Sequence, residues 1–132
     1  MESGAIGELR SRKRLQTLRL IEANDLTKQI AEAAERGDMI AAQLLLGERE
    51  EPVRAAYEVE EQIRAYLQGL PEQTAIRLSA LLRGADAESE EEQPLVDQVT
   101  QYRRLLGALT EADKRLSIRI GGKRSFYEKF KE

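Results

Sequence analysis

The chain has 132 residues, of which 34% are charged and 5% are aromatic, and its formal net charge is −3. It contains no cysteine and no histidine, which excludes disulfides, thiolate metal sites, and the Ser-His and Cys-His nucleophile pairs of hydrolases. Few large rings and many charges favour an all-α helical bundle over a sandwich or a barrel. We therefore expect neither an enzyme nor a bound cofactor or metal.

Location and charge can also be read from the sequence. The segment from Met1 to Gly7 has no apolar stretch typical of a signal peptide, and no run approaches the roughly 20 apolar residues that span a bilayer. We expect a cytoplasmic protein without membrane insertion. Residues 22–97 hold 18 acidic and 7 basic side chains, whereas residues 1–20 and 110–132 are basic. This pattern indicates either complementary helix faces or a basic surface for an acidic partner.

The first predicted helix runs from near Gly7 to Arg36. Gly37 suits the left-handed conformation that ends a helix, and the carboxylate of Asp38 can cap the helix that follows. The side chains expected on the inner face of the first helix are Leu15, Leu18, Leu26, Ile30 and Ala33.

The second predicted helix runs from Met39 to Gln68 and is ended by Gly69. Its Pro52 lacks a backbone donor, but the apolar phase continues across it, so we expect a continuous, kinked helix or two abutting segments rather than a loop. A seam with alternating spacings of three and four residues follows one face: Ala42, Leu45, Arg49, Pro52, Ala56, Val59, Ile63, Tyr66 and Leu70.

A shorter third helix is predicted between Pro71 and Gly84, because proline suits a first helical turn and glycine a helix end. Residues 85–93 carry many like charges and are expected to form a solvated loop, with the glutamates facing water. The same exposure is expected for Glu60 and Glu61. The side chains of the third helix expected to point inward are Ile76, Leu78, Leu81 and Leu82.

The last predicted helix runs from Pro94 to Gly121. Its seam keeps a 4-3 spacing through Leu95, Val99, Tyr102, Leu106, Leu109, Asp113, Leu116 and Ile120. Only Asp113 is charged. Three explanations stay open: the seam is partly open there, a cation such as Lys13 or Arg14 reaches the carboxylate, or a partner surface begins at this point.

The predicted architecture is an elongated antiparallel helical bundle of three long helices and one short helix. It comprises residues 1–121 and is followed by a basic, aromatic tail, residues 122–132. Long apolar seams also favour a homodimer through the second or the last helix, and Leu106 and Leu109 are the predicted contacts.

Two weaker motifs do not support a ligand. Gly121, Gly122 and Lys123 resemble the end of a phosphate-binding loop, but the earlier glycine and the following Ser or Thr are missing. A basic cluster near Lys13 and Arg14 could contact nucleic acid, yet the acidic total and the pI near 5.3 argue against it.

The C-terminal end is the predicted binding surface for a protein client. The apolar side chains after Asp113 point to more than one side of the helix, and Phe126 and Phe130 would share a face if the tail were helical. The alternative is that the tail folds back onto its own bundle. The predicted partner-binding residues are Leu116, Ile118, Ile120, Lys123, Arg124, Phe126, Tyr127, Lys129 and Phe130.

Three stretches resemble bacterial flagellar export chaperones of the FlgN and FliT type. They are the Glu-Arg-Gly-Asp turn at 35–38, the Leu-Leu-Leu-Gly-Glu-Arg-Glu run at 44–50, and the Leu-Leu-Arg end of the third helix at 81–83. The asparagine-rich stretch of the FlgN group is absent, so the subgroup stays open. The resemblance implies a cytoplasmic all-α protein that holds a hook-associated or filament-cap subunit before export. The rival hypothesis is a structural or regulatory coiled-coil adaptor that forms an obligate oligomer.

Overall fold

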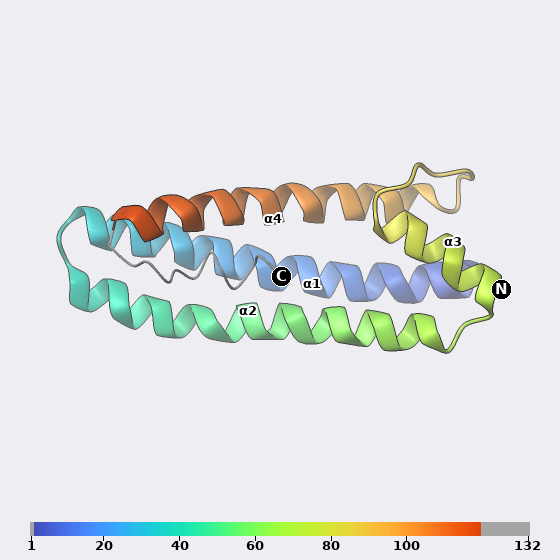
Figure 1. Cartoon of the computed structure of the whole chain (residues 1–132), viewed down its shortest axis with the longest axis horizontal. Coiled ribbons are helices and arrows are strands. Elements are labelled where there is room, and N and C mark those ends of the chain that lie inside the picture. Colours follow the sequence, from blue (N-terminus) through green and yellow to red (C-terminus); the bar gives the residue numbers. More distant parts are fainter. Residues whose placement is uncertain (1, 120–132) are drawn as a thin grey trace.

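The computed structural model describes residues 2–119 and the side chains of residues 4–117. The described chain forms four helices and no strand: α1 (Glu2–Glu35), α2 (Met39–Gln68), α3 (Glu72–Leu82) and α4 (Gln93–Arg119). The three long helices lie along the long axis, and α3 crosses one end (Figure 1). Because α3 carries the chain across that end, α4 runs antiparallel to α2 and in the same direction as α1. The predicted all-α bundle of three long helices and one short helix is confirmed.

The turn between α1 and α2 forms as the sequence predicts. Gly37 has a φ of 76°, in the left-handed region that glycine tolerates. The carboxylate of Asp38 accepts a hydrogen bond from the backbone N–H of Ala41 at 3.1 Å, which caps α2. Pro52 lies inside α2 without ending it, so the predicted continuous helix is confirmed.

The inner face of α1 differs from the prediction. Leu15 and Leu18 are 39% and 51% exposed. The positions that are buried instead keep a 4-3 spacing: Leu9, Lys13, Gln16, Leu20, Ala23, Thr27 and Ile30. Three of these seven residues are polar, so the spacing of apolar residues alone does not predict this buried face.

The buried side chains form three clusters along the bundle. The largest lies under α3, where Leu78 and Leu81 meet Leu9 of α1 and Leu95 of α4; Ile76, by contrast, is 56% exposed. The middle cluster holds Leu20, Ala23, Val53 and Leu109. The third lies near the α1–α2 turn and holds Ile30, Ala33, Ala42 and Leu116.

The acidic segment 85–93 is anchored at its end by an ion pair. Arg77 of α3 donates two hydrogen bonds to the carboxylate of Glu92, at 3.1 and 2.7 Å, and Glu92 is 6% exposed. The Arg77 guanidinium and a backbone N–H bond from Glu88 hold the pKa of Glu92 below its usual range. The prediction that every glutamate of this segment faces water is therefore wrong for Glu92.

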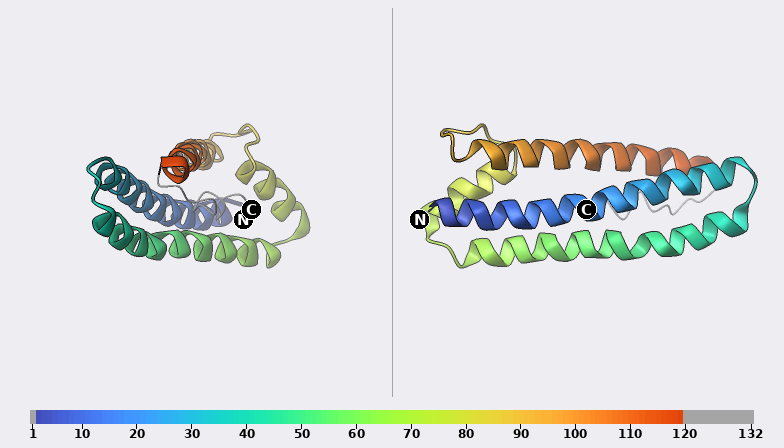
Figure 2. Two further views of the ribbon diagram at one scale, coloured as in Figure 1. Left: turned by 60° about the vertical axis from the view of Figure 1, so that its left-hand side comes forward. Right: turned by 180° about the vertical axis from the view of Figure 1, so that it is seen from behind.

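The long helices are not arranged as a closed ring. Both α2 and α4 pack along α1, but they share few contacts with each other. Figure 2 shows α1 between its two neighbours from other directions. Among residues 2–119, the side of α1 between α2 and α4 is therefore left partly uncovered.

Candidate partner-binding groove

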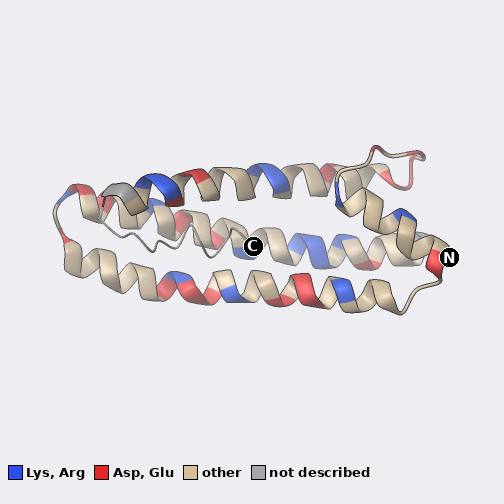
Figure 3. Cartoon of the chain, viewed as in Figure 1, with Lys and Arg blue, Asp and Glu red and all other residues tan. Residues whose placement is uncertain are grey.

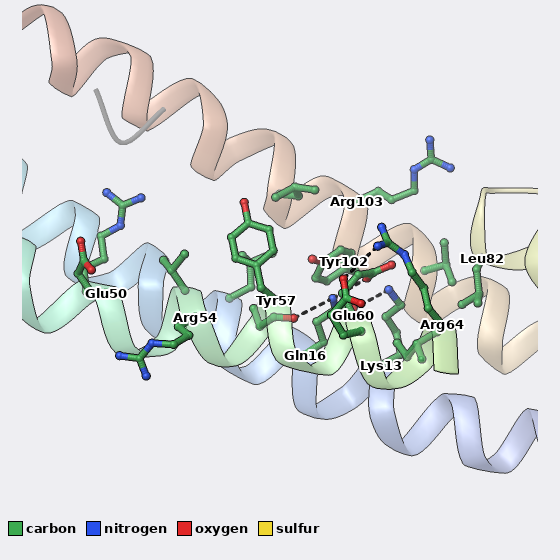
Figure 4. A pocket seen from close by; sticks show the side chains of 18 of the residues that line it. Lys13, Gln16, Glu50, Arg54, Tyr57, Glu60, Arg64, Leu82, Tyr102 and Arg103 are labelled. Carbon is green, nitrogen blue, oxygen red and sulfur yellow. Dashed lines mark hydrogen bonds and ion pairs between the residues drawn. The ribbon is translucent and has the colours of Figure 1, made fainter. Parts of the chain in front are cut away.

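A groove of about 1410 Å³ lies between α2 and α4, with α1 as its floor (Figure 4). Its apolar lining comes from each long helix and from the end of α3: Leu20, Val53, Ile63, Leu82, Val99 and Leu106. A concave, largely apolar surface of this length suits a helical segment rather than a small molecule.

A polar layer crosses the groove floor (Figure 4). The ammonium of Lys13, 5% exposed, donates a hydrogen bond to Oε1 of Gln16 at 2.7 Å. Gln16 in turn donates from Nε2 to the carboxylate of Glu60 at 2.8 Å and to the carbonyl of Ala56 at 3.3 Å. Glu60 is therefore half-buried and bonded rather than solvent-facing, as the sequence had predicted, whereas the side chain of Glu61 is 72% exposed.

Tyr102 of α4 completes this layer. Nζ of Lys13 lies 4.1 Å from the centre of the Tyr102 ring, a distance typical of a cation–π contact. Burial lowers the pKa of Lys13, an effect that the nearby Glu60 carboxylate opposes. Burial also raises the pKa of Tyr102 to about 12. Polar side chains at seam positions restrict the register in which helices pack.

The exposed lining of the groove, its rim, is more basic than the chain as a whole, in which acidic and basic residues alternate along every long helix (Figure 3). Among the lining residues that are exposed, four are Arg and two are Glu; Lys13 and Arg49 also line the groove but are buried. Arg64 of α2, Arg83 after α3 and Arg103 of α4 line the end nearest α3. Arg103 donates to the backbone carbonyl of Arg83, which joins α4 to the end of α3.

A buried ion pair joins α2 to α4 beside the groove. Nη2 of Arg49 lies 2.7 Å from Oδ2 of Asp113, and the two side chains are 3% and 0% exposed. The explanation that a cation reaches Asp113 is therefore confirmed, but the cation is Arg49 and neither of the two named examples: Lys13 bonds to Gln16, and Arg14 is exposed. The sequence did contain the signal, because Arg49 and Asp113 are opposite charges at seam positions of two predicted helices.

Comparison of the chain with protein-family models, with curated proteins and with solved structures found no match. None of the described helices has the length and apolar character needed to cross a membrane. Within residues 2–119, no three acidic side chains stand together in a way that could hold a metal ion. The function is therefore inferred from the geometry of the groove.

The residues predicted to bind partners fall into three groups. Leu109 and Leu116 are buried against other helices of the same chain and offer no exposed surface in this conformation. Leu106 is half-buried and lines the groove. The others lie outside the residues whose side chains are described, and their role stays a prediction: Ile118, Ile120, Lys123, Arg124, Phe126, Tyr127, Lys129 and Phe130.

The structure does not support the third explanation for Asp113, that a partner surface begins there. Leu116 lies beyond Asp113 and is still buried, in the cluster with Ile30, Ala33 and Ala42. The seam of α4 therefore continues at least one turn past the ion pair. The groove could not be predicted from apolar spacing, because Lys13 and Gln16, two of the α1 residues that line it, are polar.

Proposed function

We propose that this chain is a cytoplasmic export chaperone of the flagellar type, which holds a helical segment of a protein client in the groove. One observation carries the proposal: α2 and α4 both pack on α1, and no other helix of the described part of the chain occupies the fourth position of a bundle. A helix laid into this groove would cover Val53, Val99 and Leu106 and complete a four-helix arrangement. No chemical step is needed for such a function.

The choice of client rests on the resemblance to the FlgN and FliT group, which points to a hook-associated or filament-cap subunit. The same resemblance supports a cytoplasmic location. The tail, residues 122–132, is proposed as a second client contact, since it combines aromatic and basic side chains. Groove and tail are separable by experiment.

The test is binding of purified hook-associated and filament-cap proteins, measured by isothermal titration calorimetry. Tyr57 lines the groove and is 44% exposed, so Tyr57→Asp should weaken client binding at least tenfold without unfolding the protein. Leu18 is similarly exposed but does not line the groove, which makes Leu18→Asp the matched control. Deleting residues 122–132 measures the tail separately. Equal client affinity for the Tyr57 and Leu18 variants would reject the groove as the client site.

A second candidate function is a coiled-coil adaptor that forms a homodimer. The observation in its favour is an exposed apolar face at the start of α2, where Met39, Ile40 and Leu44 are 42%, 77% and 67% exposed. Ile40 and Leu44 are four residues apart and share a side of the helix. Sedimentation equilibrium should then show a dimer that Leu44→Asp converts to a monomer. A monomeric wild-type protein at high concentration contradicts this candidate.

A further inference from the structure

We infer that the groove selects an acidic amphipathic helix of about 18 residues, with its C-terminal end at Arg64, Arg83 and Arg103. This inference rests on the proposed function, because it specifies which helix the groove accepts and in which direction. It is carried by the distribution of charge around the groove and by the groove's length.

The charge of the rim is opposite to that of the chain. The net charge is −3, yet the described groove lining has twice as many cations as anions. The charged, exposed lining consists of Arg54, Arg64, Arg83 and Arg103 against Glu50 and Glu61, while Glu48, Glu51 and Glu58 of α2 do not line the groove. An occupant with acidic flanks is therefore attracted, and a basic occupant is repelled.

The three arginines at the α3 end can engage a new partner without losing strong bonds. Arg64 lies 3.0 Å from Glu61, but their side chains are 63% and 72% exposed, so this pair adds little stability. Arg83 is exposed, and Arg103 is exposed while it bonds to a backbone carbonyl. Each guanidinium keeps further donors that can reach an acidic side chain.

The two ends of the groove differ, and this difference sets the direction of the helix. A helix C-terminus has unsatisfied carbonyls and a partial negative charge, which the arginines complement. The opposite end is lined by Leu46, Gly47 and Glu50, and the Glu50 carboxylate complements a helix N-terminus. From Gly47 to Arg64 the groove follows 18 residues of α2, whose 17 steps of 1.5 Å span about 26 Å. The bound helix therefore runs antiparallel to α4.

The chain's own tail is a poor match for the groove. Residues 122–132 include Lys123, Arg124, Lys129 and Lys131 but only two glutamates. The tail is basic, like the rim, and is shorter than the groove. A separate acidic helix fits both the charge and the length.

The experiment uses three fluorescein-labelled synthetic peptides of 18 residues with one Leu seam. The first has three Glu in its last turn, the second has the same three Glu in its first turn, and the third has three Lys in its last turn. Fluorescence anisotropy should rank the first peptide tightest, at least tenfold above the Lys peptide, with the second between them. The preference should weaken as salt is raised.

Charge reversal on the protein tests the three arginines. The triple variant Arg64→Glu, Arg83→Glu and Arg103→Glu should invert the preference between the first and third peptides. The matched control reverses three exposed cations that do not line the groove, Arg14, Lys28 and Arg36, and should leave the ranking unchanged.

Orientation is tested with a nitroxide label, which is straightforward because the chain has no cysteine. A Cβ at Gly47 meets no atom within 4 Å, so Gly47→Cys places the label at the Glu50 end of the groove. We expect NMR signals from the N-terminal half of the first peptide to broaden. Gly107→Cys is the control, since Gly107 has the same free space but does not line the groove.

The outcomes separate this inference from the proposed function. Equal affinity for all three peptides overturns the acidic preference while the groove stays a helix site. Broadening of the C-terminal half overturns the direction. If deleting residues 122–132 raises the affinity for every peptide more than tenfold, the tail fills the groove and the inference is overturned. If the peptide-free protein is a dimer that dissociates on peptide binding, a second copy fills the groove, which also overturns the inference. No binding by any peptide to folded protein overturns the groove as a helix site, and the proposed function with it.

Discussion

The buried ion pair between Arg49 and Asp113 offers the sharpest test of the packing. Asp113→Ala removes the carboxylate and leaves a guanidinium that is only 3% exposed. Opposite charges about 4 Å apart attract by about 4 kcal/mol at an effective dielectric constant near 20. The desolvation of Arg49 remains when this attraction is lost, so we expect the free energy of unfolding to fall by about 3–5 kcal/mol.

Urea unfolding followed by far-UV circular dichroism measures this loss directly. For a chain of this size, the same change should lower Tm by roughly 10–20 °C. The double variant Arg49→Met with Asp113→Leu should recover most of the stability, because it removes both charges and fills the space with apolar atoms. If Asp113→Ala is too unstable to purify, Asp113→Asn gives the same comparison with a smaller change in volume.

Two results would refute the reasoning. A loss below about 1 kcal/mol for Asp113→Ala would mean that water reaches Arg49 and that the pair is not buried in solution. A double variant as unstable as the single variant would mean that the seam needs this pair for a reason other than charge balance. The control is Arg54→Ala, which breaks an ion pair of exposed side chains with Glu51 and should change stability by less than about 1 kcal/mol.

Three further measurements follow from the described contacts. Because the pKa of Glu92 is lowered from its ordinary 4.5, the stability that Glu92 contributes is complete above pH 4.5 and is lost as the pH falls through the folded-state pKa. In urea unfolding, Glu92→Gln should cost about 1–2 kcal/mol at pH 7 and flatten this acid dependence. Glu91→Gln changes an exposed residue and should do neither. Because the pKa of Tyr102 is raised from its ordinary value of 10.0 to about 12, the stability that Tyr102 contributes is complete below pH 10 and is lost between about pH 10 and 12. Tyr102→Phe should remove this alkaline loss of stability and delete the latest phase of the tyrosine absorbance titration. Leu20→Ala should cost about 2–5 kcal/mol and Leu18→Ala less than about 0.5 kcal/mol in urea unfolding, and equal costs would reject the buried register of α1.

The helices could be predicted from sequence because their signals are local. Gly37, Asp38 and Gly69 mark helix ends through backbone freedom and capping, which depend on a few neighbouring residues. The seams of α2 and α4 were also readable, since most of their positions are apolar.

The buried face of α1 and the groove could not be predicted from the sequence, because they depend on contacts between helices. Gln16 and Lys13 occupy seam positions because Glu60 bonds to Gln16 and the Tyr102 ring covers Lys13, and these contacts are separated by tens of residues in the sequence. Thr27 is buried because its hydroxyl donates to the carbonyl of Ala23 in its own helix. The choice of Leu15 and Leu18 followed the rule that apolar residues face inward, which does not hold for single surface leucines. Arg49 as the partner of Asp113 was within reach, because both residues lie on predicted seams and carry opposite charges.

The central position of α1 has a consequence for synthesis of the protein on the ribosome. Helices α1 and α2 are joined by a three-residue turn and can pair as soon as residue 68 has emerged. Leu20 and Leu9 also pack in clusters that need Leu109 and Leu95, which are made later. Until α4 has been synthesised, the nascent α1–α2 hairpin exposes an apolar strip. Whether the hairpin aggregates therefore depends on how quickly residues 93–119 are synthesised and pack against it.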